Sequence, residues 1–319
     1  MELSIVATLY CSAQTVEEFC RRAVLAAEQV AGEFEIVLVD DGSPDDSLEI
    51  ACRLAEADPR ITVVELSRNF GHHKAMMTGL EHAEGDLVFL IDSDLEEAPE
   101  LLPEFYGEMQ QRDVDVVYGY QRARKGNLFE RATGAVSYCL INRLIQHPIP
   151  RNHLTVRLMT RDYVRSLLLH RETQTIIGGL WVITGYRQHG VPVTKLHTSP
   201  TTYSLRRRCT ALIDSVTNFS EMPLIVIFYV GFAISVFSAL VGMMLVVWKL
   251  AGGTVDGWAS VMMSVWFLGG LILFSVGTIG LYVSKIFLET KNRPYTIVRR
   301  VYPAERDAAS HRRPIRRAA

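Results

Sequence analysis

Two aspartates, Asp92 and Asp94, stand two positions apart directly after the apolar run VFLI. Hard cations such as Mg²⁺ prefer oxygen ligands and often bind through one or two carboxylates together with the phosphates of a substrate. A cation held in this way can neutralise the charge that develops on a diphosphate leaving group. A D-x-D pair also occurs in ordinary acidic turns, but its position after an apolar run favours a metal site. We predict that Asp92 and Asp94 are catalytic residues that bind Mg²⁺ or Mn²⁺.

A second acidic cluster, Asp40 and Asp41 followed by Gly42 and Ser43, ends the apolar run EIVLV. A carboxylate at this place can accept hydrogen bonds from a ribose or a base, and a glycine allows the backbone to approach a ligand closely. The alternative is that Ser43 or Asp45 caps the helix that follows. Both can hold, because Asp40 and Asp41 exceed what a cap requires.

Short runs rich in Val, Ile and Leu alternate with helical stretches over the first 120 residues. This alternation predicts an α/β fold with a mostly parallel, Rossmann-like sheet. The expected strands are 4–10, 35–39, 61–66, 86–91 and 114–118, and the expected helices are 15–30, 46–57, 72–83 and 99–111. Ligands of such sheets bind outside the carboxyl ends of the strands. Both acidic clusters, and a third polar cluster at 67–69, directly follow strands.

The signals weaken beyond residue 126. There we expect a helix over 128–146, a strand near 154–159 and another strand over 295–302. Residues 204–221 place apolar side chains near one helical face, beginning with three arginines. This pattern favours an amphipathic helix on a membrane surface, and the alternative is a linker helix packed on the preceding domain.

Two runs without a charged residue, 224–248 and 258–284, each exceed the roughly 20 residues needed to cross a membrane. We therefore expect two transmembrane helices within 222–285. Basic residues precede the first run and follow the second. Because positive charge gathers on the cytoplasmic side, a domain over 1–203 and a basic tail over 286–319 are expected in the cytoplasm, at the inner (plasma) membrane. The start MELSIVATLY has the pattern of a strand and not of a signal peptide.

Composition restricts the possible partners. The net charge of −2 and the isoelectric point near 6.5 do not favour nucleic acid. The five cysteines show no metal-binding spacing, which suits a reducing compartment.

Three ordered segments, VDDGSPDDS, SRNFGHHKAMMTGLEHAEGD and LIDSDLEEAPELLPEF, resemble the polyprenyl-phosphate glycosyltransferases of glycosyltransferase family 2. This group includes dolichyl-phosphate mannose synthases and bacterial enzymes that glucosylate undecaprenyl phosphate. The resemblance covers roughly residues 4–120 and extends to the two apolar runs. It implies a GT-A fold, an inverting transfer and a nucleotide-sugar donor, among which we favour a UDP-sugar. It also suggests a homo-oligomer.

The resemblance assigns Asp92 and Asp94 to the metal diphosphate and Asp40 and Asp41 to the nucleotide. It places Arg68 and His72 at the rim of the donor site. The other candidates for binding the nucleotide-sugar are Thr8, Tyr10, Gly42, Ser43, Asn69 and Ser93.

Two positions depart from the family pattern. The first-strand motif Pro-x-Tyr-Asn-Glu stands here as TLYCS over 8–12, so an acid that contacts the nucleotide is missing. Thr155 replaces the Asp of an Asp-Phe-Arg-Leu motif. A phosphate acceptor is already mostly ionised near neutral pH and needs positioning more than a base. A hydroxyl acceptor needs a base, for which Asp94 or Glu97 would have to serve.

The candidates for acceptor binding are Arg157, Trp181, Tyr203, Arg206 and Arg207. Arginines at a membrane surface suit a lipid phosphate, although basic residues also flank membrane spans for orientation alone. Trp181 could stack against a sugar ring, although a tryptophan in such a segment is more often part of the apolar core. We predict an enzyme, a hexosyltransferase of cell-envelope polysaccharide synthesis that uses polyprenyl phosphate. The alternatives are transfer to a hydroxyl of a lipid-linked glycan or membrane lipid, and a non-catalytic scaffold that binds a nucleotide-sugar.

Overall fold

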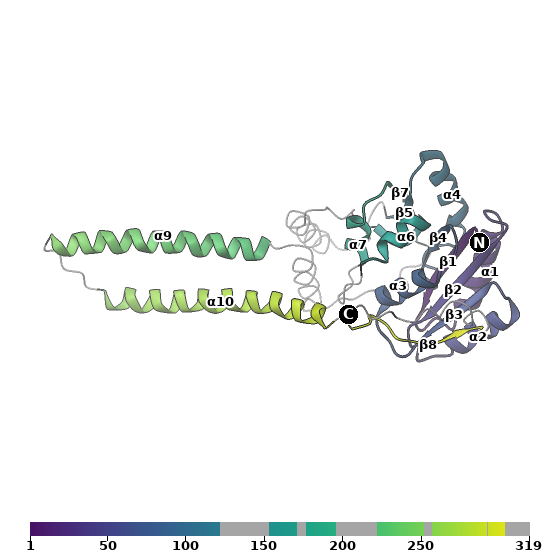
Figure 1. The fold of residues 1–319 in the computed structure, drawn as a ribbon, viewed down its shortest axis with the longest axis horizontal. Coiled ribbons are helices and arrows are strands. Elements are labelled where there is room, and N and C mark those ends of the chain that lie inside the picture. The colour runs from purple at the N-terminus through teal and green to yellow at the C-terminus, as the bar shows by residue number, and fades with distance from the viewer. Residues whose placement is uncertain (122–152, 171–176, 196–221, 252–256, 292, 304–319) are drawn as a thin grey trace, which may run out of the picture. The chain divides into compact units, whose positions relative to one another are not determined.

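The computed structural model describes residues 1–121, 153–170, 177–195, 222–251, 257–291 and 293–303. The chain divides into two compact units, one that contains a sheet and one that contains two long helices (Figure 1). The helices expected over 128–146 and 204–221 lie outside the described residues.

Eight strands of the described residues form one sheet in the order β7-β5-β6-β4-β1-β2-β3-β8. Strands β1 to β4 pair in parallel, as do β5 and β7, whereas β6 is antiparallel to β4 and β5, and β8 is antiparallel to β3. The strands are β1 (Leu3–Leu9), β2 (Phe34–Asp40), β3 (Ile61–Leu66), β4 (Leu87–Leu90), β5 (Val116–Tyr120), β6 (His153–Thr160), β7 (Gln188–Pro192) and β8 (Val298–Tyr302).

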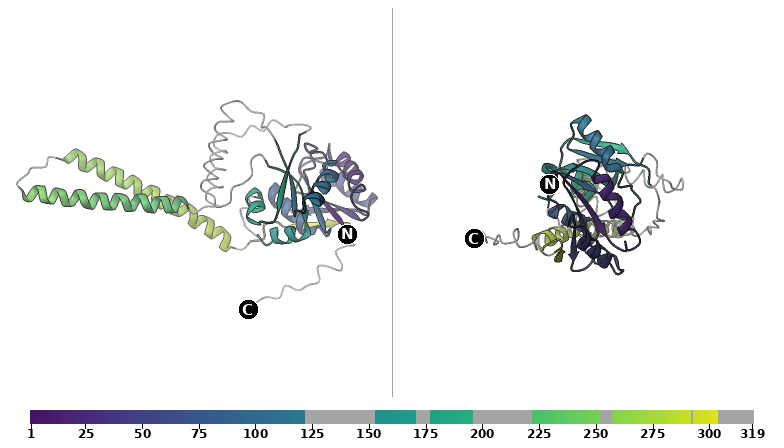
Figure 2. Two further views of the ribbon diagram at one scale, coloured as in Figure 1. Left: turned by 90° about the horizontal axis from the view of Figure 1, so that it is seen from above. Right: turned by 90° about the vertical axis from the view of Figure 1, so that its right-hand side faces the viewer.

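Helices cover both faces of the sheet (Figures 1 and 2). One apolar core holds Phe19 of α1, Ala51 of α2 and Phe105 of α4, and the other holds Met76 of α3 and Tyr163 of α6. Because the central strands are buried on both faces, they are continuous apolar runs rather than alternating ones. The helices are α1 (Val16–Ala27), α2 (Ser47–Ala57), α3 (His72–His82), α4 (Leu101–Arg112), α6 (Arg161–Leu167) and α7 (Ile177–Ile183).

This architecture confirms the prediction of an α/β fold with a mostly parallel sheet. The first five strands lie within two residues of their expected bounds, and the strand expected near 154–159 is β6. The strand β7 and the helices α6 and α7 were not predicted, because their short segments lack a clear periodicity.

Strand β8 closes the outer edge of the sheet beside β3. Its Arg299 lies 2.9 Å from Oε1 of the buried Glu65, and the Tyr302 hydroxyl donates to Glu65 Oε2 at 3.1 Å. Just before β8, the Ile297 carbonyl accepts a hydrogen bond from the Ser67 amide at 2.9 Å. A charged outer strand of this kind protects an edge that would otherwise pair with another chain.

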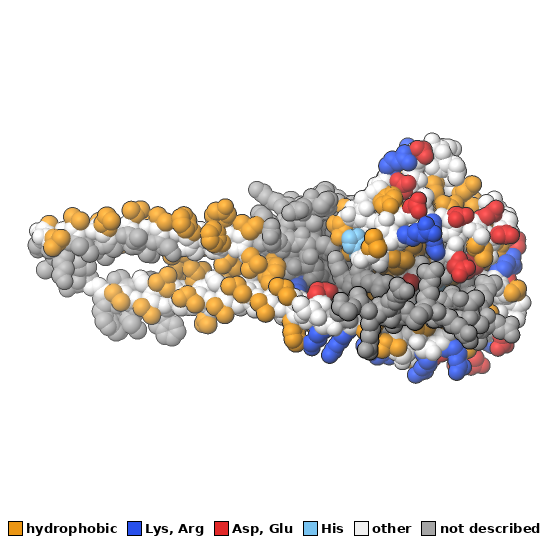
Figure 3. Space-filling view, viewed as in Figure 1, with side chains coloured by type: hydrophobic (Ala, Val, Ile, Leu, Met, Phe, Trp, Pro, Cys, Tyr) orange, Lys and Arg blue, Asp and Glu red, His pale blue; other side chains and the backbone are white. Residues whose placement is uncertain are grey.

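The second unit contains the long helices α9 (Met222–Leu250) and α10 (Trp258–Thr290). Hydrophobic side chains are exposed along both of them (Figure 3). Among the described residues, one stretch, Phe267–Thr290, is long and apolar enough to cross a membrane, and the apolar stretch in α9, Leu224–Ile234, is shorter. The presence of two membrane spans therefore stays a prediction.

Candidate active site

The acidic clusters and Thr8 meet at the carboxyl ends of the central strands. Strand β1 ends at Leu9, β2 ends at Asp40, and the Asp92 turn follows β4. Since the chain places β2 on one side of β1 and β4 on the other, the strand order reverses direction between β1 and β4. In open α/β sheets, ligands bind in the crevice at such a reversal.

Asp41 organises the loop that leads into α3. Its two carboxylate oxygens accept backbone hydrogen bonds from Phe70 at 2.7 Å and from Gly71 at 2.9 Å. Burial raises the pKa of Asp41, and these two hydrogen bonds oppose the rise. The end of β2 and the start of α3, about thirty residues apart in the chain, are thereby held together.

Asp40 and Gly42 shape the turn after β2. Asp40 accepts hydrogen bonds from the amides of Gly42 at 3.1 Å and Ser43 at 3.3 Å. Gly42 has a φ of +66°, and a Cβ there would come within 2.6 Å of the Asn69 amide nitrogen. Gly42 therefore allows a close approach to the backbone of Arg68 and Asn69. The polar cluster at 40–43 packs in this way directly on the polar cluster at 67–69.

The cap expected for α2 takes a different form. Asp46, which stands at the cap position, makes no side-chain cap hydrogen bond. Of the two predicted capping residues, Asp45 accepts a hydrogen bond from the amide of Ser47, the first residue of α2, and another from the amide of Ala13 in the loop after β1. The Ser43 hydroxyl is buried and has no hydrogen-bond partner.

His72, the first residue of α3, lies between Thr8 and Asp92. Its Nδ1 is 3.1 Å from Thr8 Oγ1 and its Nε2 is 3.3 Å from Asp92 Oδ1. The His72 side chain is 48% exposed and that of Asp92 is 21% exposed. This contact joins the ends of β1 and β4 to the start of α3.

The carboxyl of Asp92 is destabilised in its charged form. Burial raises its pKa to about 7, the nearby Asp94 adds to the rise, and a hydrogen bond from Thr155 opposes it. Asp92 Oδ1 is a buried oxygen without a hydrogen bond. Among the described residues, no three His, Cys, Asp or Glu side chains form a ready ligand set. The orphaned oxygen and the second carboxylate nevertheless fit a hard divalent cation that takes its remaining ligands from substrate phosphates and water.

Ser93 and Asp94 face different surroundings. The Ser93 hydroxyl is buried and donates a hydrogen bond to the Thr8 carbonyl at 2.7 Å, which ties the turn to β1. Asp94 is exposed and accepts a hydrogen bond from the Glu96 amide at 2.9 Å. Asp94 is thus free to approach a ligand, while contact of Ser93 with a donor remains a prediction.

Arg157 and Trp181 form a buried stack. The Arg157 guanidinium carbon lies 3.0 Å from the centre of the Trp181 ring, and the two residues are 1% and 4% exposed. Burial lowers the pKa of Arg157 to about 9. Arg157 donates to the carbonyls of Leu154 and Thr155, but its Nη1 and the Trp181 Nε1 have no hydrogen-bond partner. Trp181 is accordingly part of the core in this structure.

The remaining predicted residues have other surroundings or lie outside the described residues. Tyr10, directly after β1, is 54% exposed, and the Arg68 side chain stacks on the Phe70 ring at 4.0 Å. Tyr203, Arg206 and Arg207 lie outside the described residues.

Lys195, after β7, was not predicted as a site residue. Its Nζ lies 2.6 Å from Glu96 Oε2 and 2.9 Å from Glu97 Oε1, in the turn that carries Asp94. Glu97 is 1% exposed; burial raises its pKa to about 7, and Lys195 opposes the rise. No sequence signal marks Lys195, because about one hundred residues separate it from its partners.

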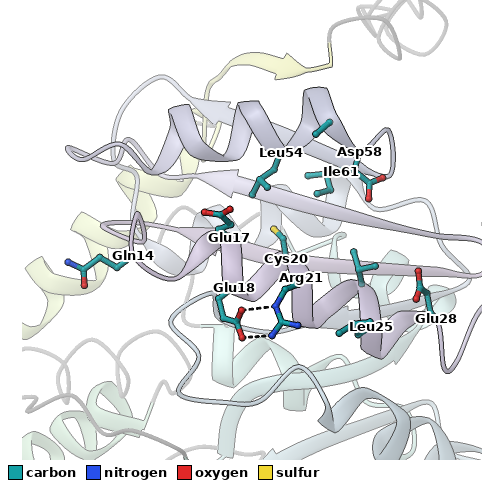
Figure 4. A pocket seen from close by; sticks show the side chains of 12 residues that line it. Gln14, Glu17, Glu18, Cys20, Arg21, Leu25, Glu28, Leu54, Asp58 and Ile61 are labelled. Atoms are coloured by element: carbon teal, nitrogen blue, oxygen red, sulfur yellow. Dashed lines mark hydrogen bonds and ion pairs between the residues drawn. The ribbon is translucent and has the colours of Figure 1, made fainter.

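A groove of about 790 Å³ lies elsewhere, along α1 and α2 (Figure 4). Arg21 and Glu18, which form an ion pair, line it together with Cys20 and Leu54. None of the residues at the carboxyl ends of the strands lines this groove, so it is separate from the candidate active site.

Comparison with known proteins defines the class. Residues 4–168 match the family described as Glycosyl transferase family 2, which is just over half of the chain. The chain belongs to this family, and it is a glycosyltransferase of the GT-A-like α/β type.

Relatives match along nearly the whole chain. A Mycobacterium tuberculosis (strain CDC 1551 / Oshkosh) protein with a glycosyltransferase name is 49% identical over 96% of this chain and 90% of its own length. The SfII prophage-derived bactoprenol glucosyl transferase of Shigella flexneri is 30% identical over 94% of this chain and 98% of its own. A solved mannosyltransferase of Pyrobaculum calidifontis, in complex with GDP-Man and Mn²⁺, is 18% identical with a TM-score of 0.49, covering 90% of this chain and 84% of that one.

Proposed function

We propose that this chain is a membrane-anchored, inverting glycosyltransferase that moves a sugar from a nucleotide-sugar, with a UDP-sugar as the favoured donor, to polyprenyl phosphate. The observation that carries the proposal is the meeting of Asp92, His72 and the Asp41 loop at the strand reversal. Full-length relatives named bactoprenol glucosyl transferase support the choice of acceptor. Transfer of glucose to bactoprenol is reported in their names, and its extension to this chain belongs to the proposal.

In this proposal Asp92 and Asp94 hold Mg²⁺ or Mn²⁺, which neutralises the departing diphosphate when bound. His72 and Thr155 orient Asp92, since both contact it. Asp40 and Asp41 keep the donor loop in shape, because their carboxylates bind the backbone amides of that loop. Arg68 and Asn69, whose backbone packs on Gly42, are proposed to contact the nucleotide of the donor.

A phosphate acceptor is compatible with Thr155 in place of the acid of the family pattern. Such an acceptor is already mostly ionised near pH 7, so it needs cations for positioning more than it needs a base. Arg206, Arg207 and Tyr203, which precede the first apolar run, are proposed to meet the lipid phosphate. Arg157 is proposed to position Thr155. It stacks on Trp181 and donates a hydrogen bond to the Thr155 carbonyl, which holds this part of β6 in place. In an inverting transfer, the acceptor phosphate would displace the nucleoside diphosphate from the anomeric carbon of the sugar in a single step.

The second candidate, transfer to a hydroxyl, rests on Glu97. This carboxyl is buried, has an unpaired Oε2, and carries a pKa raised to about 7, all of which suit a general base. In that case the acceptor is a lipid-linked glycan or a membrane lipid.

Chain topology supports the two membrane spans. Strand β8 follows α10 in the chain but pairs with β3, which precedes α9. Because one sheet lies on one side of a membrane, the chain crosses an even number of times between these strands. If Phe267–Thr290 is one crossing, the other long apolar helix, α9, supplies the second. The basic residues around both runs put the sheet and the tail on the cytoplasmic side of the inner membrane. The homo-oligomer remains part of the proposal.

The test uses full-length protein purified in detergent with a panel of nucleotide-sugars. Each donor is offered with undecaprenyl phosphate and, separately, with a neutral lipid-linked sugar, and the lipid product is identified by its mass. The expected product is a glycosylated polyprenyl phosphate that forms only with a divalent cation. A product on the neutral acceptor alone would replace the phosphate proposal by the hydroxyl one, and binding of donor without any transfer would indicate a scaffold.

A further inference from the structure

We propose that His72 is a third protein ligand of the divalent cation and makes the site prefer Mn²⁺, a first-row transition metal, over Mg²⁺. This inference rests on the proposed function, which places the cation on Asp92 and Asp94. It adds a nitrogen donor to a site otherwise built from oxygens.

The spacing of the two donor atoms supports a shared cation. His72 Nε2 and Asp92 Oδ1 are 3.3 Å apart, yet Oδ1 has no hydrogen bond, so the two atoms are close without the alignment of a hydrogen bond. Two ligand atoms at neighbouring corners of an octahedron, each about 2.1 Å from the metal, lie about 3 Å apart. A cation between Nε2 and Oδ1 therefore requires little movement of either side chain.

The other ring nitrogen is held as metal-binding histidines usually are. His72 Nδ1 is hydrogen-bonded to Thr8 Oγ1 at 3.1 Å, which fixes the ring and leaves Nε2 facing the carboxylate. Histidine ligands commonly use their second nitrogen in this way. The backbone is fixed as well, because the preceding Gly71 donates its amide to Asp41. His72 is thus preorganised by contacts with β1 and with the turn after β2.

The ligand atoms of the proposed site, one imidazole nitrogen and several oxygens, predict the preference for Mn²⁺ over Mg²⁺. Mg²⁺ favours oxygen ligands and keeps its waters, whereas imidazole suits transition metals. Asp94, the second carboxylate, does not form a ready ligand set with His72 and Asp92. Because it is exposed, its side chain can turn toward a cation and complete the set together with phosphate oxygens. The alternative is that His72 donates a hydrogen bond to a donor phosphate while the metal is bound by oxygen atoms alone.

The experiment measures metal binding by the full-length protein in detergent with UDP as the nucleotide. Pulsed electron paramagnetic resonance of bound Mn²⁺ is expected to show coupling to a ¹⁴N nucleus, because an imidazole nitrogen is directly bound. His72→Gln should lose this coupling. His73→Gln is the matched control, since the two rings are neighbours with centroids 6.0 Å apart, and it should keep the coupling.

Competition titrations provide a second readout. In His72→Gln the ratio of Mn²⁺ to Mg²⁺ affinity should fall by on the order of tenfold or more, and in His73→Gln it should be unchanged. Bound Mn²⁺ without ¹⁴N coupling in the unmodified protein, or an unchanged ratio in His72→Gln, would overturn the role of His72 and leave the Asp92–Asp94 metal site standing. Failure of the unmodified protein to bind Mn²⁺ at all would overturn both.

Discussion

Thr155 lies beside Asp92. The antiparallel pairing of β4 with β6 sets Leu90 opposite Arg157, and the same register two residues further along brings Thr155 to Asp92. Burial raises the pKa of Asp92 to about 7, and the hydrogen bond from Thr155 opposes that rise. A neutral hydroxyl therefore supports this carboxylate at the position where the family pattern has an acid.

Changing Thr155 to Asp tests the acceptor. Thr155→Asp puts back the acid of the family pattern. Because a phosphate acceptor is already mostly ionised and gains little from a base, the rate of transfer to undecaprenyl phosphate should change by less than about threefold. Thr155→Asn, which has the shape of Asp without its charge, should behave alike. Initial rates with each acceptor decide the point: faster transfer to a neutral acceptor in Thr155→Asp would favour the hydroxyl reaction.

Asp92→Asn should lower turnover by about a hundredfold or more, because it removes a metal-binding charge without changing shape. The melting temperature should not fall, since the buried Oδ1 has no hydrogen bond to lose. Turnover with Mn²⁺ and a thermal melt are the measurements. Asp46→Asn, at an exposed position without a cap hydrogen bond, is the control that should keep full activity. Normal turnover of Asp92→Asn would exclude the metal role.

Gly42→Ala should disturb the donor loop. The new Cβ would lie 2.6 Å from the Asn69 backbone, and φ is +66°, which disfavours any side chain. We expect a loss of about 1–3 kcal/mol in the free energy of unfolding and weaker UDP binding, measured by denaturant titration and calorimetry. Gly107→Ala in α4 meets no atom within 4 Å and should be neutral or stabilising. Equal behaviour of the two variants would contradict the packing of Gly42 on Asn69.

Lys195→Met should make stability depend more strongly on pH. Burial raises the pKa of Glu97 from 4.5 to about 7, so the folded protein binds more protons than the unfolded chain between these values. Stability from this group accordingly falls as pH rises from about 4.5 to about 7. Without the cation 2.9 Å from Glu97, the free energy of unfolding at pH 8 should drop by about 1–3 kcal/mol, with a smaller loss at pH 5.

The double variant Glu97→Gln with Lys195→Met separates charge from packing. Removing the buried carboxylate together with its partner should restore most of the stability at pH 8. Denaturant unfolding at both pH values is the measurement. A loss of equal size at pH 5 and pH 8 in Lys195→Met would show that Glu97 ionisation is not its cause.

The two-span topology is tested by cysteine labelling in a background without the native cysteines. Ala251→Cys follows α9, and Arg300→Cys lies in β8. In intact cells a membrane-impermeant maleimide should react with Ala251→Cys, while Arg300→Cys should react only after the membrane is opened. Protection of Ala251→Cys in intact cells would contradict the two-span topology, which puts the connection between α9 and α10 on the outer side.

The sequence by itself determined the central strands of the sheet and the edge at which the polar clusters lie. Strands buried on both faces must be continuous apolar runs, so β1, β2, β3 and β4 were readable from local composition. Polar residues directly after such runs lie at one edge of a parallel sheet, which is why Asp40 and Asp92 were both predicted to lie at the carboxyl ends of the strands. The family resemblance added the class of enzyme, and the family match confirmed it.

Only the tertiary structure decided how distant segments meet. The contact of Thr155 with Asp92 depends on the register of an antiparallel strand, and that of Lys195 with Glu97 depends on β7, whose sequence has no clear period. Burial of Trp181 against Arg157 likewise follows from packing of α7 on β6. Local patterns encode the face and period of an element, whereas these contacts arise from the pairing of segments far apart in the chain, which no local pattern specifies.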